Sequence, residues 1–178
     1  MNTISTILLI IGSVILCLCF LLKHSNFLDI RQIFVQHFCI FQGNILQLIG
    51  IFFTPILFAV GLAEIKCIDK DILSNLNIIL SILTAMFFSV LSILCSFDKE
   101  RKNENYKQLL KETFNTSIFE IILCLLLLFI SFIVLFIGEF KESVALKIIS
   151  GIIYYLTMVT ILNILVVIKR IKVLFDNQ

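Results

Sequence analysis

One acidic side chain, Glu120, stands inside a long apolar run, and its position points more directly to chemistry than that of any other residue. A carboxyl group within a membrane helix is costly, and such groups commonly bind protons or ions or line a water-filled pathway. Because Ser131 and Gly138 continue roughly the same helical face, Glu120 is a candidate intramembrane charge that serves as an ion ligand or gate. We favour another interpretation, in which Glu120 lies at the cytoplasmic headgroup level and reaches water or pairs with Lys111 or Lys172.

Small and hydroxyl-bearing residues recur every three or four positions along the apolar run 76–95 and at its edges, so they fall on one stripe of a helix. Such a stripe lets helix backbones approach closely, and its hydroxyls bond across the contact; we favour this packing role. The alternative is the wetted lining of an oligomeric pore, with one stripe from each subunit facing a common axis. The candidate packing or pore stripe consists of Ser74, Asn77, Ser81, Ala85, Ser89, Ser92 and Ser96.

Pro55 is the single proline of the chain and lies inside another apolar run, 45–63. A proline removes one backbone donor and clashes with the preceding helical turn, so we predict a kink near Thr54. A hinge or gate is one use of such a kink, but we favour a kink that neighbouring helices simply pack around. Gly50 and Gly61 are expected to add close-packing surface beside it.

Residue types that catalyse reactions or bind metals do not come together in a convincing pattern. Arg31 and His37 have the Arg-x5-His spacing of HEPN-type ribonucleases, but the chain lacks the soluble helical bundle on which those enzymes present it. The six cysteines are scattered, mostly in apolar runs, without the paired spacings of zinc or iron–sulfur sites. No phosphate-binding loop or nucleophile elbow is present. We therefore predict no catalytic, cofactor-binding or metal-binding residues and a protein that is not an enzyme.

Composition indicates the class of protein. Hydrophobic residues make up 60% of the 178 residues and charged residues 15%, and the mean hydropathy is +1.12. Soluble domains are about half apolar and one quarter charged, and a chain of this length buries only about 70% of its unfolded surface. The surplus apolar area therefore needs the lipid bilayer as a second solvent. A net charge of only +2 argues against direct binding of nucleic acid.

Five apolar runs without lysine or arginine are long enough to cross about 30 Å of hydrocarbon as helices. They occupy residues 4–22, 45–63, 76–95, 118–137 and 148–168. The first run lacks the basic start of a secretory signal, so we expect a retained span; otherwise four spans remain. The predicted fold class is all-α, a single multi-pass transmembrane helical bundle over residues 1–178.

The basic residues orient this bundle. With five spans, ten of the 14 lysines and arginines fall on one side, in 23–44, 97–117 and 169–178, and four fall on the other. Because lysine and arginine concentrate in cytoplasmic loops, the amino terminus is predicted to lie outside and the carboxyl terminus in the cytoplasm.

Two cytoplasmic connections are longer than tight turns. Residues 23–44 mix charges with bulky apolar side chains, which suits a helix lying in the membrane interface or folded back against the bundle. Residues 97–117 are typical of a helical extension whose Leu109, Leu110 and Phe114 rest on the membrane or on a partner. Solvated linkers remain an alternative for both.

The layout from Ile51 to Lys172 resembles small multi-pass membrane subunits of bacterial antiphage defence systems, among them the membrane subunit of the Kiwa system. The resemblance rests on 51–55, the serine-striped run, the basic linker, 115–120 and 169–172, and covers roughly two-thirds of the chain. It transfers no functional residue. It implies a subunit of the bacterial inner membrane that forms homo-oligomers, detects infection at the envelope and works with a cytosolic protein.

Three functions are therefore considered. The favoured one is an integral membrane subunit of a bacterial defence complex, acting as sensor, anchor or scaffold, with a cytosolic partner docked on 97–117 and on the tail. The second is an oligomeric pore-forming effector that depolarises the membrane through the serine stripe. The third is a small transporter or channel in which Glu120 takes part in flux.

Overall fold

The computed structural model describes residues 11, 12, 15, 30–40, 45–97, 104–137 and 143–176. Within them, every regular element is a helix. The elements are α2 (Ile30–Cys39), α3 (Ile45–Leu48), the π-helical turn η1 (Ile49–Phe53), α4 (Thr54–Ile65), α5 (Lys70–Ser96), α6 (Glu104–Ile137) and α7 (Val144–Asp176). The predicted all-α fold is confirmed.

Four helices in the described part of the chain are long and apolar enough to cross a membrane, and α3, η1 and α4 together form the first of them. The four are Leu46–Ile65, Lys70–Ser96, Glu104–Phe136 and Val144–Asp176. They correspond to the last four predicted spans. Of the first predicted span, 4–22, only residues 11, 12 and 15 are described, so that span stays a prediction.

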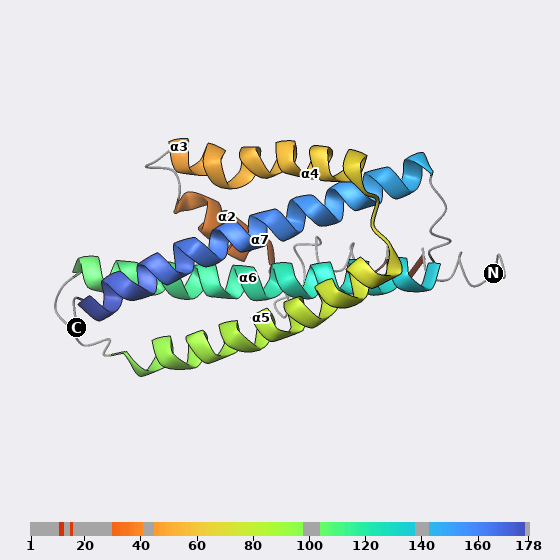
Figure 1. The fold of residues 1–178 in the computed structure, drawn as a ribbon. Helices are drawn as coiled ribbons and strands as arrows, with labels where there is room; N and C mark the ends of the chain where they lie inside the picture. The colour runs from red at the N-terminus through yellow and green to blue at the C-terminus, as the bar shows by residue number, and fades with distance from the viewer. Residues whose placement is uncertain are drawn as a thin grey trace.

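The long helices run alternately up and down the bundle (Figure 1). α5 packs against α6, α6 against α7 and α7 against α4, while the short α2 lies on α6. One end of the bundle gathers the end of α5, the start of α6 and the end of α7. The opposite end gathers the end of α4, the start of α5, the end of α6 and the start of α7.

Side-chain caps fix where α5 and α7 begin. Asp69 accepts a 2.8 Å hydrogen bond from the Ile72 amide, and Ser143 accepts a 3.1 Å bond from the Leu146 amide, so two otherwise orphaned helix amides are satisfied. The Ile72 amide, followed by the ammonium of Lys66 2.9 Å away, holds the pKa of Asp69 below its usual value. This capped connection reverses the chain within a few residues.

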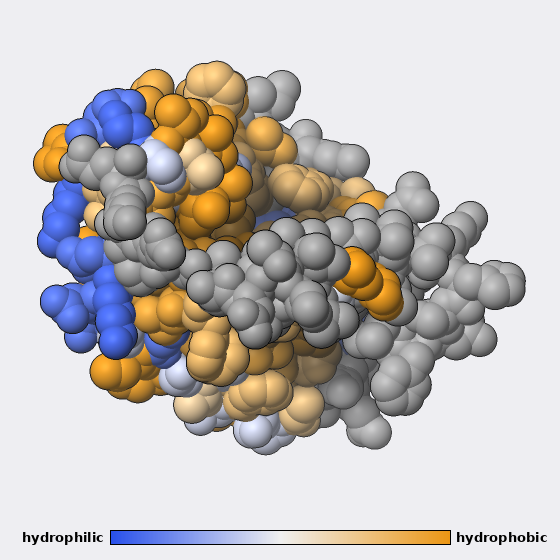
Figure 2. All heavy atoms as spheres, turned by 90° about the vertical axis from the view of Figure 1, so that its right-hand side faces the viewer, coloured by the Kyte–Doolittle hydropathy of each residue, from blue (hydrophilic) through white to orange (hydrophobic). Residues whose placement is uncertain are grey.

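Apolar side chains cover the outside of the bundle as well as filling its core. Leu73, Leu80 and Ile153 have almost no exposed surface and belong to the central core. On the outside, Phe53 is 62% exposed and Leu57 is 70% exposed, which is the expected state of side chains that face lipid. Figure 2 looks onto the α4–α5 end, where hydrophilic residues gather along one edge beside this apolar surface.

The spans differ from the prediction chiefly at one end. α6 begins at Glu104, within the predicted connection 97–117, and α7 continues to Asp176. Apolar contacts stabilise these extensions through a helix-end cluster of Leu94, Phe97, Tyr106, Leu110 and Leu174. Leu109 and Phe114 pack against it, so the apolar positions of 97–117 rest on the protein's own helix ends.

Backbone geometry changes just before Pro55. The Thr54 amide donates to the Ile49 carbonyl, five residues back, which makes η1 a single π-helical turn. The wider turn is one way for a helix to accommodate a proline, which clashes with the preceding turn. None of the described residues packs closely against Gly50 or Gly61, since a Cβ added at either would meet none of their atoms within 4 Å.

Candidate functional site

Glu120 lies in the interior of the bundle with no exposed surface. This differs from the favoured sequence interpretation, in which its carboxylate reached water or a lysine at the helix end. The reason is that α6 extends 16 residues before Glu120, since it begins at Glu104. Neither carboxyl oxygen makes a hydrogen bond of ordinary geometry to a residue in the described ranges.

An ion pair marks the depth of Glu120 along the bundle. Arg170 of α7 donates to Glu112 of α6 at 3.0 Å, and both side chains are partly exposed. Glu120 follows Glu112 by eight residues, which is a rise of about 12 Å along an α-helix. Because this displacement is directed toward the apolar run 118–137, Glu120 lies near the start of the apolar part of α6, deeper in the bundle than the ion pair.

Three helices contribute polar side chains to the surroundings of Glu120. The Asn163 amide of α7 interacts with the Glu120 carboxyl. Cys124, on the next turn of α6, lies near Glu120 and within hydrogen-bonding reach of Thr84 of α5. Thr84, Glu120, Cys124 and Asn163 form what we call the polar centre, and all four are buried.

Asn163 and Thr160 stand on one side of the last apolar run and are not among the site residues predicted from the sequence. Asn163 precedes Arg170 by seven residues, almost the separation of Glu112 from Glu120. Since Glu112 and Arg170 are paired and the helices are antiparallel, Glu120 and Asn163 must lie at the same depth.

An aromatic layer from α2 covers the neighbouring face of α6. The His37 ring stacks on Phe119 with centroids 3.8 Å apart and planes within 5°, and Phe34 meets Phe119 edge-on at 5.0 Å. Asn115 donates to Gln36 at 2.9 Å beside this layer. α2 is therefore folded back against the bundle, which is one of the two arrangements expected for residues 23–44.

Burial changes the acid–base properties of His37. The side chain has no exposed surface, and desolvation, followed by the charge of Arg170, lowers the pKa of His37 to about 4. A ring that is packed against Phe119 and fully buried is inaccessible to a large substrate such as RNA. The Arg-x5-His spacing therefore supports no nuclease site in this structure.

The serine stripe of α5 faces outward. Asn77 is half-buried, and the other six members, from Ser74 to Ser96, are exposed. The hydroxyls of Ser81, Ser89 and Ser92 donate to carbonyls of their own helix at 2.8, 3.1 and 3.1 Å. These three hydroxyls therefore need no neighbouring helix to satisfy them, and within the stripe only Asn77 is partly covered.

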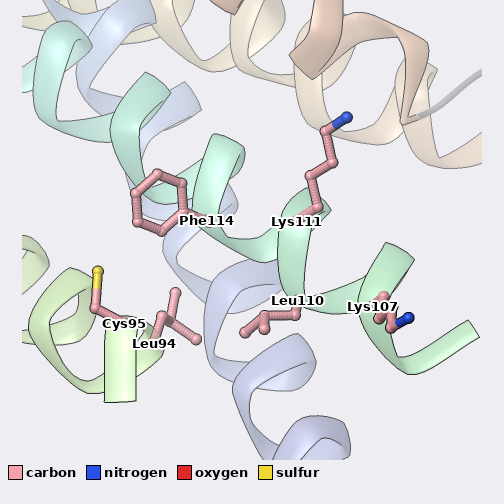
Figure 3. A pocket seen from close by; sticks show the side chains of 6 residues that line it. All are labelled: Leu94, Cys95, Lys107, Leu110, Lys111 and Phe114. Atoms are coloured by element: carbon pink, nitrogen blue, oxygen red, sulfur yellow. The ribbon is translucent and has the colours of Figure 1, made fainter. Parts of the chain in front are cut away.

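A pocket of about 340 Å³ lies between the end of α5 and the start of α6 (Figure 3). Leu94, Leu110 and Phe114 supply apolar walls, and Lys107 and Lys111 border it with their ammonium groups directed away from the apolar side chains. The pocket thus joins the helix-end cluster to a basic rim.

Within the described ranges, no group of three or more histidine, cysteine, aspartate and glutamate side chains is placed to hold a metal ion. Compared with known protein families, curated proteins and solved structures, the chain matches none. Its class follows from its own fold and composition: it is a multi-pass, all-α membrane protein.

Proposed function

We propose that this chain is the integral membrane subunit of a larger complex, an anchor or sensor whose projecting helix ends dock a cytosolic partner. The observation that carries this proposal is the packed extension of three helices at one end of the bundle, held together by the helix-end cluster.

Helix length supports a projecting surface. α6 has 34 residues and α7 has 33, which corresponds to about 50 Å each at helical rise. The hydrocarbon core is about 30 Å thick, so roughly 20 Å of each helix extends beyond it when the helices stand upright. The polar residues of both helices concentrate at the end where α6 starts and α7 finishes, so both extensions project on the same side.

Rigidity supports a docking role for this end. Leu94 and Leu174 are almost fully buried, and Phe97 and Phe175 meet edge-on with centroids 5.2 Å apart. The part-buried Glu112–Arg170 pair adds a directional contact between α6 and α7. Pre-organised surfaces bind partners with a smaller entropy cost than flexible linkers do.

Charge and resemblance supply the biological context. The projecting end belongs to the side with ten of the 14 basic residues, which supports a cytoplasmic location. Together with the resemblance to membrane subunits of antiphage systems, this supports a role in bacterial defence at the inner membrane, where the subunit reports a change in the envelope to its partner.

Co-purification tests the proposal. The full chain, expressed with the products of its neighbouring genes, is extracted in mild detergent as wild type, as Lys107→Glu with Lys111→Glu, and as Lys70→Glu. The first variant reverses the basic rim of the projecting end, whereas Lys70 is exposed at the opposite end. A cytosolic partner should be retained by wild type and by Lys70→Glu and lost at least tenfold from the double variant.

Phage challenge of the same strains tests the defence role. Protection should follow partner retention across the three proteins. A wild-type subunit that purifies without any cytosolic protein, or a double variant that binds and protects as wild type does, would refute the proposal.

An oligomeric pore is the second candidate, and the outward position of the serine stripe favours it. A hydroxyl-rich face that no described helix covers is available to subunits around a common axis. Ser81→Leu and Ser89→Leu should abolish dye leakage from expressing cells while leaving the protein in the membrane; leakage that persists in both variants argues against the pore.

A further inference from the structure

The polar centre and the nearby Thr160 contain more oxygen ligands than their own hydrogen bonds use. Both carboxyl oxygens of Glu120, the amide oxygen of Asn163 and the hydroxyl of Thr160 are buried without a hydrogen bond of ordinary geometry to a described residue. Thr160 stands one turn from Asn163 on α7, and all three side chains are at most 1% exposed. Unpaired buried oxygens in a packed bundle are costly, so they point to a ligand.

Charge identifies the kind of ligand. A lone carboxylate in a medium of low dielectric constant is costly unless a positive charge accompanies it. Arg170 follows Asn163 by about 10 Å of helical rise and is already paired with Glu112. A ligand with a single positive charge would balance Glu120, whereas a divalent ion would leave one charge in excess.

Donor chemistry narrows the choice further. Carboxylate, amide and hydroxyl oxygens are hard ligands that suit protons and alkali-metal ions better than transition metals. The thiol of Cys124 interacts with the hydroxyl of Thr84. We propose that Glu120, with Asn163 and Thr160, forms an intramembrane site for a monovalent cation, a proton or a sodium ion.

The other elements packed here contribute no competing charge in the described part of the chain. α5 presents the Thr84 hydroxyl, α6 presents Cys124, and α7 presents Asn163 and Thr160. On α2, His37 contacts the adjacent Phe119. Its pKa of about 4 leaves it neutral above about pH 7, so ion effects measured there are separable from titration of His37.

Carbodiimide labelling tests the site independently of any partner. Dicyclohexylcarbodiimide enters apolar regions and modifies protonated carboxyl groups, and the adduct is located by mass spectrometry on the full chain in lipid nanodiscs. Wild type and Glu112→Gln should be labelled at Glu120, and Glu120→Gln should lose that adduct. For a proton site, labelling falls as the pH is raised and does not depend on sodium. For a sodium site, sodium but not choline slows it at least tenfold at constant pH.

Thermal unfolding supplies the second measurement. The melting temperature of wild type should depend on pH or on sodium. That dependence should disappear in Glu120→Gln, which replaces the carboxyl by a neutral group of similar size. Asn163→Leu keeps the carboxyl and removes a ligand, so the midpoint of the labelling response should shift at least tenfold. Absence of a Glu120 adduct under all conditions, or equal ion dependence in wild type and Glu120→Gln, would overturn the proposal.

Discussion

Acidification should loosen α2 from the bundle through His37. In the unfolded or detached state this imidazole has a pKa near 6.5, whereas burial lowers it to about 4 in the packed structure. The detached state therefore binds more protons between these values, and stability falls as the pH falls. The stability that the neutral His37 ring contributes to the packed state is complete above about pH 6.5. It decreases between about pH 6.5 and about pH 4 and is lost below about pH 4.

The size of the effect follows from the shift. A difference of about 2.5 units corresponds to about 3 kcal/mol once both states are protonated. At about pH 5 the detached state is favoured by about 2 kcal/mol relative to neutral pH, which is roughly a 30-fold change in the opening equilibrium. Protonation places a charge inside the aromatic layer, where desolvation disfavours it.

Hydrogen exchange of the full chain in nanodiscs measures the opening directly. Amides of Ile30–Cys39 should exchange roughly 30-fold faster at about pH 5 than at about pH 7, after correction for the intrinsic pH dependence of exchange. His37→Phe keeps a planar ring and cannot be protonated, so its α2 amides should show no such acceleration. Equal acceleration in wild type and in His37→Phe would refute the assignment of the effect to this imidazole.

Three further substitutions test the packing by thermal or denaturant unfolding in detergent. Ser150→Ala removes the acceptor of the buried 2.9 Å hydrogen bond from the Ile68 amide and should lower the free energy of unfolding by about 1–3 kcal/mol. The exposed control Ser89→Ala should change it by less than about 0.5 kcal/mol. Equal losses in the two variants would contradict this prediction. Leu110→Ala leaves a cavity in the helix-end cluster and should lower the free energy of unfolding by about 2–5 kcal/mol. Amide hydrogen exchange at 104–114 should become faster. An unchanged exchange rate would argue against a stabilising role for that cluster. A double-mutant cycle of Arg170→Ala and Glu112→Ala should give a coupling of about 1 kcal/mol, and zero coupling would exclude a stabilising pair.

Sequence patterns predicted where the spans lie but not where the helices end. The apolar runs 76–95 and 118–137 lie within α5 and α6. Hydropathy locates lipid contact, and it carries no information on whether a polar stretch continues the helix. Residues from Glu104 to Ser117 stay helical because Leu110 and Tyr106 pack against α5 and α7, which is a tertiary effect.

The environment of Glu120 was unpredictable for a related reason. Its distance from the edge of the apolar run indicated shallow burial, but a side chain's exposure depends on which neighbours extend alongside it. α7 extends beyond this level and presents Asn163 to it. In contrast, the small and hydroxyl-bearing stripe of α5 was evident from the sequence pattern. The direction that the stripe faces could not be predicted, because it depends on how α6 packs against α5.

The π-helical turn before Pro55 alters how any substitution scan of this span must be interpreted. One additional residue in the turn Ile49–Phe53 rotates α3 relative to α4 by the equivalent of one position, roughly 100° about the axis. Sensitive sites in the single turn of α3 will therefore be out of phase with the 3.6-residue series along α4. A lipid-facing direction fitted to the whole run Leu46–Ile65 would be wrong on one side of the π-helical turn.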